Sequence, residues 1–259
     1  MQKPIILKLF LISLLIGFFF SCNSAKSIQQ QKTNAGVVIT FDDCFIKEWN
    51  DADMQLAKYK WKATFCVSNV PQITKNDFGT LKNFQLKGHE IAGHGYNHIN
   101  AKEFSKKYGK KKYIETEITP LIQAFQHQGI ILNSFAYPFG AKTQTLDSEL
   151  KKHFKIIRAT AGGYKKVRNN SNFYNGKPIL NGIGIDTRYK HFSIKYITKV
   201  LNYAKRNNKV VIFYAHKPVT KATANYEVEM KTLEFICQYV RNNQMQFYTL
   251  NDLNSLKKR

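Results

Sequence analysis

The sequence predicts an α/β fold in which parallel strands close into a distorted barrel of about seven strands. From Ala35 onward, short apolar segments alternate with longer amphipathic ones, a pattern typical of strands joined by crossover helices. Seven or eight such units follow one another, and nothing in the composition marks a second domain. A single series of this length favours closure into a barrel.

The N-terminal residues predict export of the 259-residue chain. Lys3 and Lys8 precede an apolar run at 9–20. The run is short for a transmembrane helix, and a basic start followed by such a run is typical of a secretory signal. The run leads to Cys22 in a context that resembles a bacterial lipoprotein signal. We therefore expect residues 1–21 to be a signal peptide and Cys22 to carry a lipid anchor in the bacterial cell envelope, facing the periplasm or the cell surface. An ordinary cleaved signal or an uncleaved anchor remains the alternative, because Phe19 and Phe20 replace the usual Leu and small residue.

Residues 22–34 are polar and unpatterned, and we interpret them as a tether. The predicted domain comprises residues 35–259. Its expected strands, each a short apolar run, are 37–41, 63–67, 90–94, 134–138, 155–160, 179–185, 210–216 and 246–250. The clearest helical patterns lie at 116–129, 145–154, 193–207 and 227–243.

The cysteines do not predict a disulfide framework. Apart from Cys22, the chain contains Cys44, Cys66 and Cys237, an odd number for an exported protein. Cys44 and Cys66 could meet at neighbouring strand ends. Buried free thiols are the simpler expectation.

The formal charge of +23 is strongly basic. No zinc finger, RRM or helix-turn-helix pattern accompanies it, so no nucleic-acid partner is expected. Attraction to an anionic envelope or polysaccharide suits an exported protein. Because Lys is spread along the chain and Asn is abundant, we attribute most of the charge to composition. No protein partner is expected.

Two adjacent carboxylates, Asp42 and Asp43, directly follow the apolar residues 37–41. Their mutual repulsion and loss of hydration would be costly in an enclosed site. A cation bound to one of them relieves that repulsion and leaves the other free to accept a proton. An Asp that caps a turn after a strand is the alternative interpretation.

Three histidines lie in the segment GHEIAGHGYNH at 88–98. His94 and His98 are four residues apart, which on a helical turn would place both imidazoles on one face. His89, at the start of the expected strand, is interpreted as structural. Two imidazoles and a carboxylate match the protein ligands of catalytic zinc, which keeps a position open for water. The same set suits non-haem iron oxygenases, but those resemble all-β barrels and would leave Asp42 unexplained.

His216 ends the apolar run 210–216 and could protonate a leaving group. Asp42, Asp43, His94 and His216 all stand where an expected strand stops. In a parallel barrel the carboxyl ends of the strands form the active-site face. These residues are therefore expected to meet in one site.

The ordered motifs resemble those of the polysaccharide deacetylase family, the NodB homology domain of carbohydrate esterase family 4. They are TFDD at 40–43, H-x-x-x-H at 94–98, YPFG at 137–140 and a strand that ends in His216. The resemblance covers about residues 35–253 and implies a NodB-like distorted (β/α) barrel. It also implies metal-dependent removal of acetyl groups from N-acetylated sugars, with Asp42 as general base and His216 as general acid. The implied cofactor is one divalent metal ion, Zn²⁺ before Co²⁺ or Ni²⁺, held by Asp43, His94 and His98.

The chain departs from the family pattern at three motif positions, and the family's fourth-motif Asp-Trp pair is not evident. Gly95 replaces the usual Ser or Thr, Cys44 replaces the usual Gly, and Ala136 stands where an Arg usually orients the base. Asp186, after the expected strand 179–185, is then the best candidate for a base-orienting partner. Contacts with the substrate and its oxyanion are expected from the YPFG motif, at Tyr137, Pro138 and Phe139.

The expected partner is an acetylated polysaccharide or glycan, and peptidoglycan, poly-N-acetylglucosamine, chitin oligomers and acetylated xylan all remain open. An O-acetyl polysaccharide esterase of the same fold is one alternative function. A non-catalytic sugar-binding relative is another, although Asp42 and His216 are both present. A purely structural zinc site would need four ligands, and the sequence offers three convincing ones.

Overall fold

The computed structural model describes residues 34–164 and 166–256. The expected signal peptide, Cys22 and the tether up to residue 33 lie outside the described residues. In the described part of the chain, no helix has the length and hydrophobicity needed to cross a bilayer.

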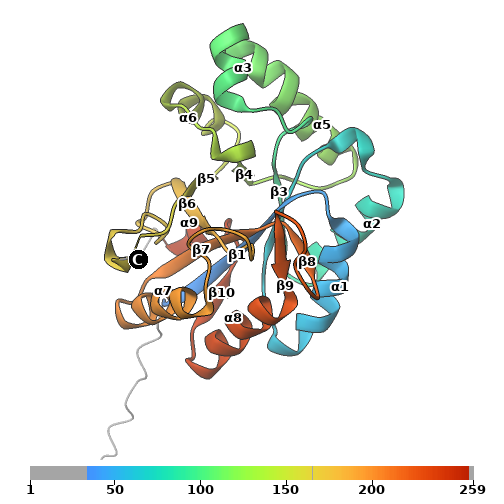
Figure 1. Cartoon of the computed structure of the whole chain (residues 1–259). Helices are drawn as coiled ribbons and strands as arrows, with labels where there is room; N and C mark the ends of the chain where they lie inside the picture. The colour runs from blue at the N-terminus through green and yellow to red at the C-terminus, as the bar shows by residue number, and fades with distance from the viewer. Residues whose placement is uncertain (1–33, 165, 257–259) are drawn as a thin grey trace, which may run out of the picture. The chain divides into compact units, whose positions relative to one another are not determined.

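Parallel strands form a closed ring at the centre of the described part of the chain (Figure 1). Within the described residues the ring has seven strands: β1 (Gly36–Asp43), β2 (Thr64–Val67), β3 (Glu90–Gly93), β4 (Ser134–Ala136), β5 (Ile156–Ala161), β6 (Ile179–Gly184) and β7 (Val210–Ala215). Pairing of β1 with β7 closes it. The predicted distorted (β/α) barrel is confirmed.

The last predicted strand, β10 (Gln246–Tyr248), lies beside β1 outside the ring order. It pairs with Gly36–Val38 in the first half of β1, whereas β2 pairs with Thr40–Asp43 in the second half. The amino-terminal end of β1 therefore separates from β2, which is one source of the distortion. At β3 and β4 the ladder is reduced to the pair Gly93 and Phe135.

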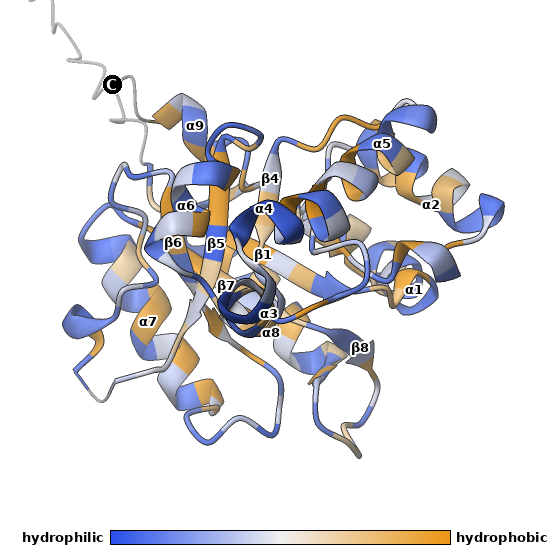
Figure 2. Cartoon of the chain, turned by 90° about the horizontal axis from the view of Figure 1, so that it is seen from above, coloured by the Kyte–Doolittle hydropathy of each residue, from blue (hydrophilic) through white to orange (hydrophobic). Residues whose placement is uncertain are grey.

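Helices surround the ring (Figure 1). The α-helices are α1 (Ile46–Leu56), α2 (Lys75–Leu86), α3 (Ala101–Tyr108), α4 (Lys110–Tyr113), α5 (Thr119–His127), α6 (Gln144–Leu150), α7 (Ile194–Arg206), α8 (Met230–Asn242) and α9 (Leu253–Leu256). Short turns of other helix types are η1 (Ala57–Tyr59), η2 (Val70–Gln72), η3 (Ile114–Ile118, a π-helix), η4 (Pro138–Gly140) and η5 (Val167–Asn169). Figure 2 shows that the helices mix hydrophilic and hydrophobic residues, with α3 and α4 mostly hydrophilic.

Two helix predictions were too long. The pattern 145–154 exceeds α6, which ends at Leu150. The pattern 227–243 was expected to be helical throughout, but Glu227–Glu229 form β9, which pairs in parallel with β8 (Lys217–Val219). Helix α8 therefore begins at Met230. The two short strands were not predicted, because three-residue strands carry almost no periodic pattern.

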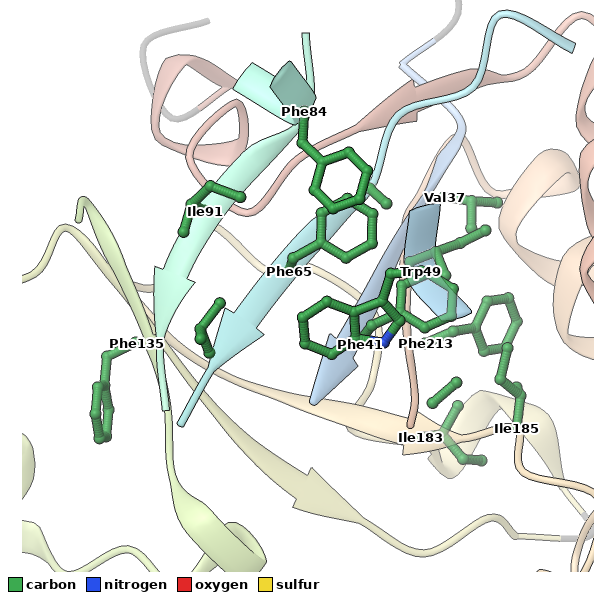
Figure 3. Close-up of a cluster of buried hydrophobic side chains, with 14 of the residues drawn as sticks. Val37, Phe41, Trp49, Phe65, Phe84, Ile91, Phe135, Ile183, Ile185 and Phe213 are labelled. Atoms are coloured by element: carbon green, nitrogen blue, oxygen red, sulfur yellow. The ribbon is translucent and has the colours of Figure 1, made fainter. Parts of the chain in front are cut away.

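Successive side chains of β1 point alternately to the main hydrophobic core and to the interior of the barrel. Val37, Ile39 and Phe41 belong to the main hydrophobic cluster, which lies between strands and helices, with Phe41 stacked on Phe65 at 5.6 Å between ring centroids (Figure 3). Val38 belongs to a second cluster, together with Cys66 and Ala136. Since successive side chains of a strand point to opposite faces, Asp42 points inside the barrel.

Candidate active site

Asp42 and Asp43 are the last two residues of β1. The Asp42 side chain is buried inside the barrel and lines a cavity of about 280 Å³ at the carboxyl ends of the strands. Asp43 turns away from the strand with φ 84°, a conformation that Asp tolerates better than most residues. One strand end therefore presents both carboxylates to the same cavity.

The loop after β3 carries His94 and His98, and the expected helical turn there is wrong. The backbone N–H of Tyr96 donates to the carbonyl of Glu117, and those of Asn97 and Ile99 donate to its carboxylate at 3.0 and 3.2 Å. These donors are therefore unavailable for helical i to i−4 bonds. His98 adopts φ 62° instead.

The conformation and packing of the same loop explain why position 95 is a glycine. Its φ is +86°, and a Cβ added there would lie 2.7 Å from Glu117 Oε2. The buried carboxylate of Glu117 occupies the space that a serine or threonine side chain would need. The family's usual residue at this position is therefore excluded by the local packing.

The structure brings Asp43, His94 and His98 together. One ligand atom from each lies within 4.8 Å of the others, with Asp43 Oδ1 3.6 Å from His94 Nε2 and 3.2 Å from His98 Nε2. Asp43 Oδ1 is buried and has no hydrogen-bond partner among the described residues. A buried carboxylate oxygen that faces two imidazole nitrogens without a hydrogen bond fits a divalent metal ion, which would coordinate all three.

The protonation states of these residues also fit a metal ion. Burial lowers the pKa of His94 to about 4, so its imidazole is neutral at pH 7. Its Nδ1 lies 2.9 Å from the carbonyl oxygen of Ala136 and can donate to it, which leaves the lone pair on Nε2 for a metal. Burial alone would raise the pKa of Asp43, but the adjacent His98, His94 and His216 hold it at about 2.

Asp42 pairs with Arg158, a residue that sequence reasoning missed. The Nη2 of Arg158 donates to Asp42 Oδ1, and both side chains are buried. Arg158 is on β5 directly opposite Ala136 of β4 in the strand register. The small side chain of Ala136 thus lies beside the arginine that contacts the expected base. An arginine inside the apolar run KIIRAT was the signal in the sequence.

The base-orienting role expected for Asp186 is corrected by its contacts. Asp186 Oδ2 lies 2.6 Å from His216 Nδ1, and Oδ1 accepts the backbone N–H of His216 at 3.1 Å. Asp186 follows β6, and β6 pairs with β7, which places it beside His216 rather than Asp42. Burial lowers the pKa of His216, but the bond to Asp186 outweighs it and the net pKa is raised.

The YPFG residues lie at the cavity, but both hydrogen-bond donors of Tyr137 already have acceptors within the protein. Its hydroxyl donates to Asp147 Oδ1 at 2.9 Å and its N–H donates to the Arg158 carbonyl, so neither is available for an oxyanion. Pro138 is buried and has no N–H to donate. Phe139 is 63% exposed with φ 59°, and its ring lies 4.7 Å from that of His98. Of the three, only Phe139 has an N–H without a hydrogen-bond partner within residues 34–164 and 166–256.

Aromatic side chains that the sequence did not single out line the rest of the cavity: Tyr189, Tyr214 and Tyr226. The ring of Tyr214 lies 5.2 Å from the Arg158 guanidinium carbon, a cation–π distance. These residues come from segments far apart in the sequence, and no local pattern joins them.

His89 and the cysteines lie outside this arrangement. His89 Nε2 lies 2.9 Å from Asp53 Oδ1, and its Nδ1 accepts the N–H of Ala63, which agrees with a structural role. Cys44, Cys66 and Cys237 are free thiols, and Cys66 and Cys237 are buried.

Comparisons with known proteins find a related sequence family and related folds. The sequence model of the family described as "Polysaccharide deacetylase" matches residues 29–155, a range that contains Asp42, Asp43, His94 and His98. Arg158, Asp186 and His216 lie beyond the matched range. The comparison with curated proteins finds no match.

Several solved structures share the fold. A putative polysaccharide deacetylase from Mycobacterium smegmatis has a TM-score of 0.63 at 12% identity, covering 88% of this chain and 92% of that one. The peptidoglycan deacetylase PdaC from Bacillus subtilis gives 0.53 at 16%, covering 88% and 93%. The Xyl-CE4 domain of a multidomain xylanase from the hindgut metagenome of Trinervitermes trinervoides gives 0.52 at 17%, covering 86% and 91%. At such identities the likeness shows the fold.

Proposed function

We propose that this enzyme, whose chain carries a polysaccharide deacetylase domain, removes acetyl groups from N-acetylated sugars of a polysaccharide or of peptidoglycan. One observation carries the proposal. A single cavity gathers a carboxylate paired with an arginine, a histidine paired with a carboxylate, and a three-residue metal-ligand set. Hydrolysis of an amide requires a base, an acid and a means of activating water, and these groups supply all three.

Asp43, His94 and His98 would hold one divalent metal ion, and we propose Zn²⁺. When bound, such an ion lowers the pKa of water toward neutrality and polarises a carbonyl. Asp42 takes the proton from the attacking water. Arg158 keeps the Asp42 carboxylate oriented and compensates its charge inside the barrel.

His216 donates the proton that the leaving amine needs. Because Nδ1 contacts the Asp186 carboxylate, Nε2 is the atom that can give up a proton. The contact with Asp186 raises the pKa of His216, which favours the protonated ring that an acid requires. A sugar amine is a poor leaving group unless it is protonated, so an acid at this position meets a requirement of amide hydrolysis. The N–H of Phe139 is the proposed donor to the oxyanion.

We also propose, from the sequence, that Cys22 is lipidated and anchors the enzyme in the cell envelope. Cys22→Ser should release the protein from the membrane fraction or leave the signal uncleaved. A variant that fractionates and migrates like the wild type contradicts this proposal.

The decisive experiment measures acetate release by mass spectrometry over a panel of glycans. The panel contains N-acetylated peptidoglycan, N-acetylglucosamine polymers and O-acetylated xylan, each with added Zn²⁺. We expect release from an N-acetylated member, loss of release in Asp42→Asn and His216→Ala by about 10²- to 10⁴-fold, and retained metal in both variants. Release from the O-acetylated xylan alone would favour the esterase alternative, and no release from any glycan would overturn the proposal.

A further inference from the structure

We infer that Tyr226 binds the sugar next to the reacting one, in a second cavity beside the catalytic cavity. The inference rests on the proposed function and deepens it, because it requires a glycan longer than the acetylated sugar itself. It concerns a residue that neither the motifs nor the catalytic groups include.

Tyr226 has a strained backbone, with φ 61°, and burial of its side chain in the core does not account for it. Among the described residues, those with positive φ other than glycine are Asp43, Lys60, Asn69, His98, Phe139, Asn208, Tyr226 and Gln244. Four of them, Asp43, His98, Phe139 and Tyr226, line the catalytic cavity. A positive φ is unusual for a bulky residue, and such strain concentrates at active sites and ligand clamps. Tyr226 is also 54% exposed, so core packing does not compensate the strain.

The segment that carries Tyr226 is firmly held. The carboxylate of Glu227 accepts the backbone N–H groups of Thr223 and Ala224 at 2.7 and 2.8 Å. The carbonyl of Tyr226 accepts the N–H of Lys217 at 3.0 Å, which joins the segment to β8. The ring is therefore presented by a tied loop rather than by a loose one, and its binding surface is preorganised.

Tyr226 lines two cavities. In the catalytic cavity its ring lies 4.9 Å from the ring of His216, the proposed acid. The second cavity, of about 180 Å³, has a lining that includes Asp186, Arg188, Tyr189, Asn225 and Tyr226. Tyr189 and Tyr226 line both cavities. A group bound in the second cavity is thus adjacent to the reaction centre on the His216 side.

The chemistry of the second cavity suits a pyranose. The apolar face of a sugar ring, where C–H groups point outward, packs against an aromatic face, and the hydroxyl groups require polar partners. Arg188 and Asn225 are exposed and have no side-chain hydrogen bond or ion pair within residues 34–164 and 166–256. They can donate to hydroxyl oxygens, and the Asn225 carbonyl can accept from a hydroxyl. The occupant is therefore a neighbouring sugar of the same glycan chain.

The test compares acetate release from N-acetylglucosamine oligomers of one to six units, with Zn²⁺ added. Wild-type kcat/KM should rise as the oligomer grows beyond one sugar. Tyr226→Asn removes the ring but keeps a residue that tolerates positive φ, and it should lose most of that rise, with KM for the hexamer about ten-fold higher. Tyr226→Phe keeps the ring and should keep the rise. Tyr108→Ala, which removes a comparably exposed tyrosine on α3, should behave as wild type.

The failures of the two proposals are distinguishable. A wild type that releases acetate and a Tyr226→Asn variant with the full length dependence would overturn the inference and leave the deacetylase function intact. If the wild type releases no acetate, calorimetric titration with the hexamer decides the inference. Weaker binding by Tyr226→Asn than by wild type and Tyr108→Ala supports it. Equal binding, or no binding by any of them, overturns it.

Discussion

Ala136 and Arg158 face each other across β4 and β5, and the arginine reaches the Asp42 carboxylate inside the barrel. In the motif that the sequence resembles, the arginine stands at position 136 instead. The two positions are neighbours in the sheet, so a guanidinium can enter the same interior from either. At the scale of single residues, the positive charge beside Asp42 comes from β5 in this chain, since Ala136 of β4 has none.

We expect Arg158→Ala to lose activity and stability. It leaves Asp42 as an uncompensated buried carboxylate, and breaking a buried ion pair costs about 3–5 kcal/mol. The double variant Arg158→Ala with Ala136→Arg should recover part of both, because the guanidinium is returned to the same carboxylate. Thermal unfolding and acetate release measure the two effects. A double variant no better than Arg158→Ala would contradict the exchange of positions.

Asp186→Asn should move the high-pH limb of activity to lower pH. The proposed acid must be protonated, and the negative charge of Asp186 raises the pKa of His216 against the lowering effect of burial. Without that charge burial dominates, the proton is lost at lower pH, and activity declines earlier as pH rises. The pH profile of kcat/KM checks this, with Asp51→Asn on the exposed side of α1 as control. An unchanged limb would mean that Asp186 does not set the pKa of His216.

At the scale of elements, the π-helix η3 (Ile114–Ile118) organises the loop that carries two proposed metal ligands. Glu117 is fully buried and accepts donors from Asn97 and Ile99, on either side of His98. An irregular turn in a helix frequently marks a functional position. Here it directs one carboxylate into the loop 94–98.

Glu117→Gln should weaken metal binding while the fold is kept. An amide presents only one acceptor oxygen, so part of the support of the loop is lost, and losses of outer partners typically cost about 10- to 100-fold in metal affinity. Competition with a chelator measures Kd for Zn²⁺. Glu115→Gln, two residues away and half-exposed, is the matched control and should bind like wild type. Equal affinities in both variants would show that the loop does not depend on Glu117.

At the scale of the whole molecule, the barrel brings together, from five strands, the residues of the cavity and the partners that contact them. Asp42 and Asp43 come from β1, His94 follows β3, Arg158 is on β5, Asp186 follows β6, and His216 follows β7. A metal ion bound by β1 and the loop after β3 would tie together parts of the ring that are far apart along the chain.

Zn²⁺ should therefore raise the unfolding temperature. A ligand at 100 times its Kd stabilises the folded state by about 2.7 kcal/mol, which for a domain of this size is an increase of about 5–10 °C. A chelator should reverse the increase, and Asp43→Ala should abolish it. Differential scanning calorimetry with and without Zn²⁺ measures the shift. An equal increase in Asp43→Ala would place the stabilising ion elsewhere.

The sequence by itself determined the barrel and the five motif residues that meet in the cavity. Strand alternation and helix periodicity are local properties, and carboxyl ends of parallel strands converge whatever the loops do. Asp42, Asp43, His94 and His216 each stand at such an end, and His98 lies in the loop that follows β3, so their meeting could be expected before their contacts were seen.

Only the tertiary structure decided the partners of these residues. Arg158 rather than Asp186 contacts Asp42, because strand register and not sequence distance sets which side chains share the barrel interior. Glu117 shapes the loop at 94–98, and Tyr226 lines two cavities, through contacts between segments that no periodic pattern relates. Such contacts depend on how the turns fold between elements, and the free energy that selects them comes from burial and hydrogen bonding across the whole domain.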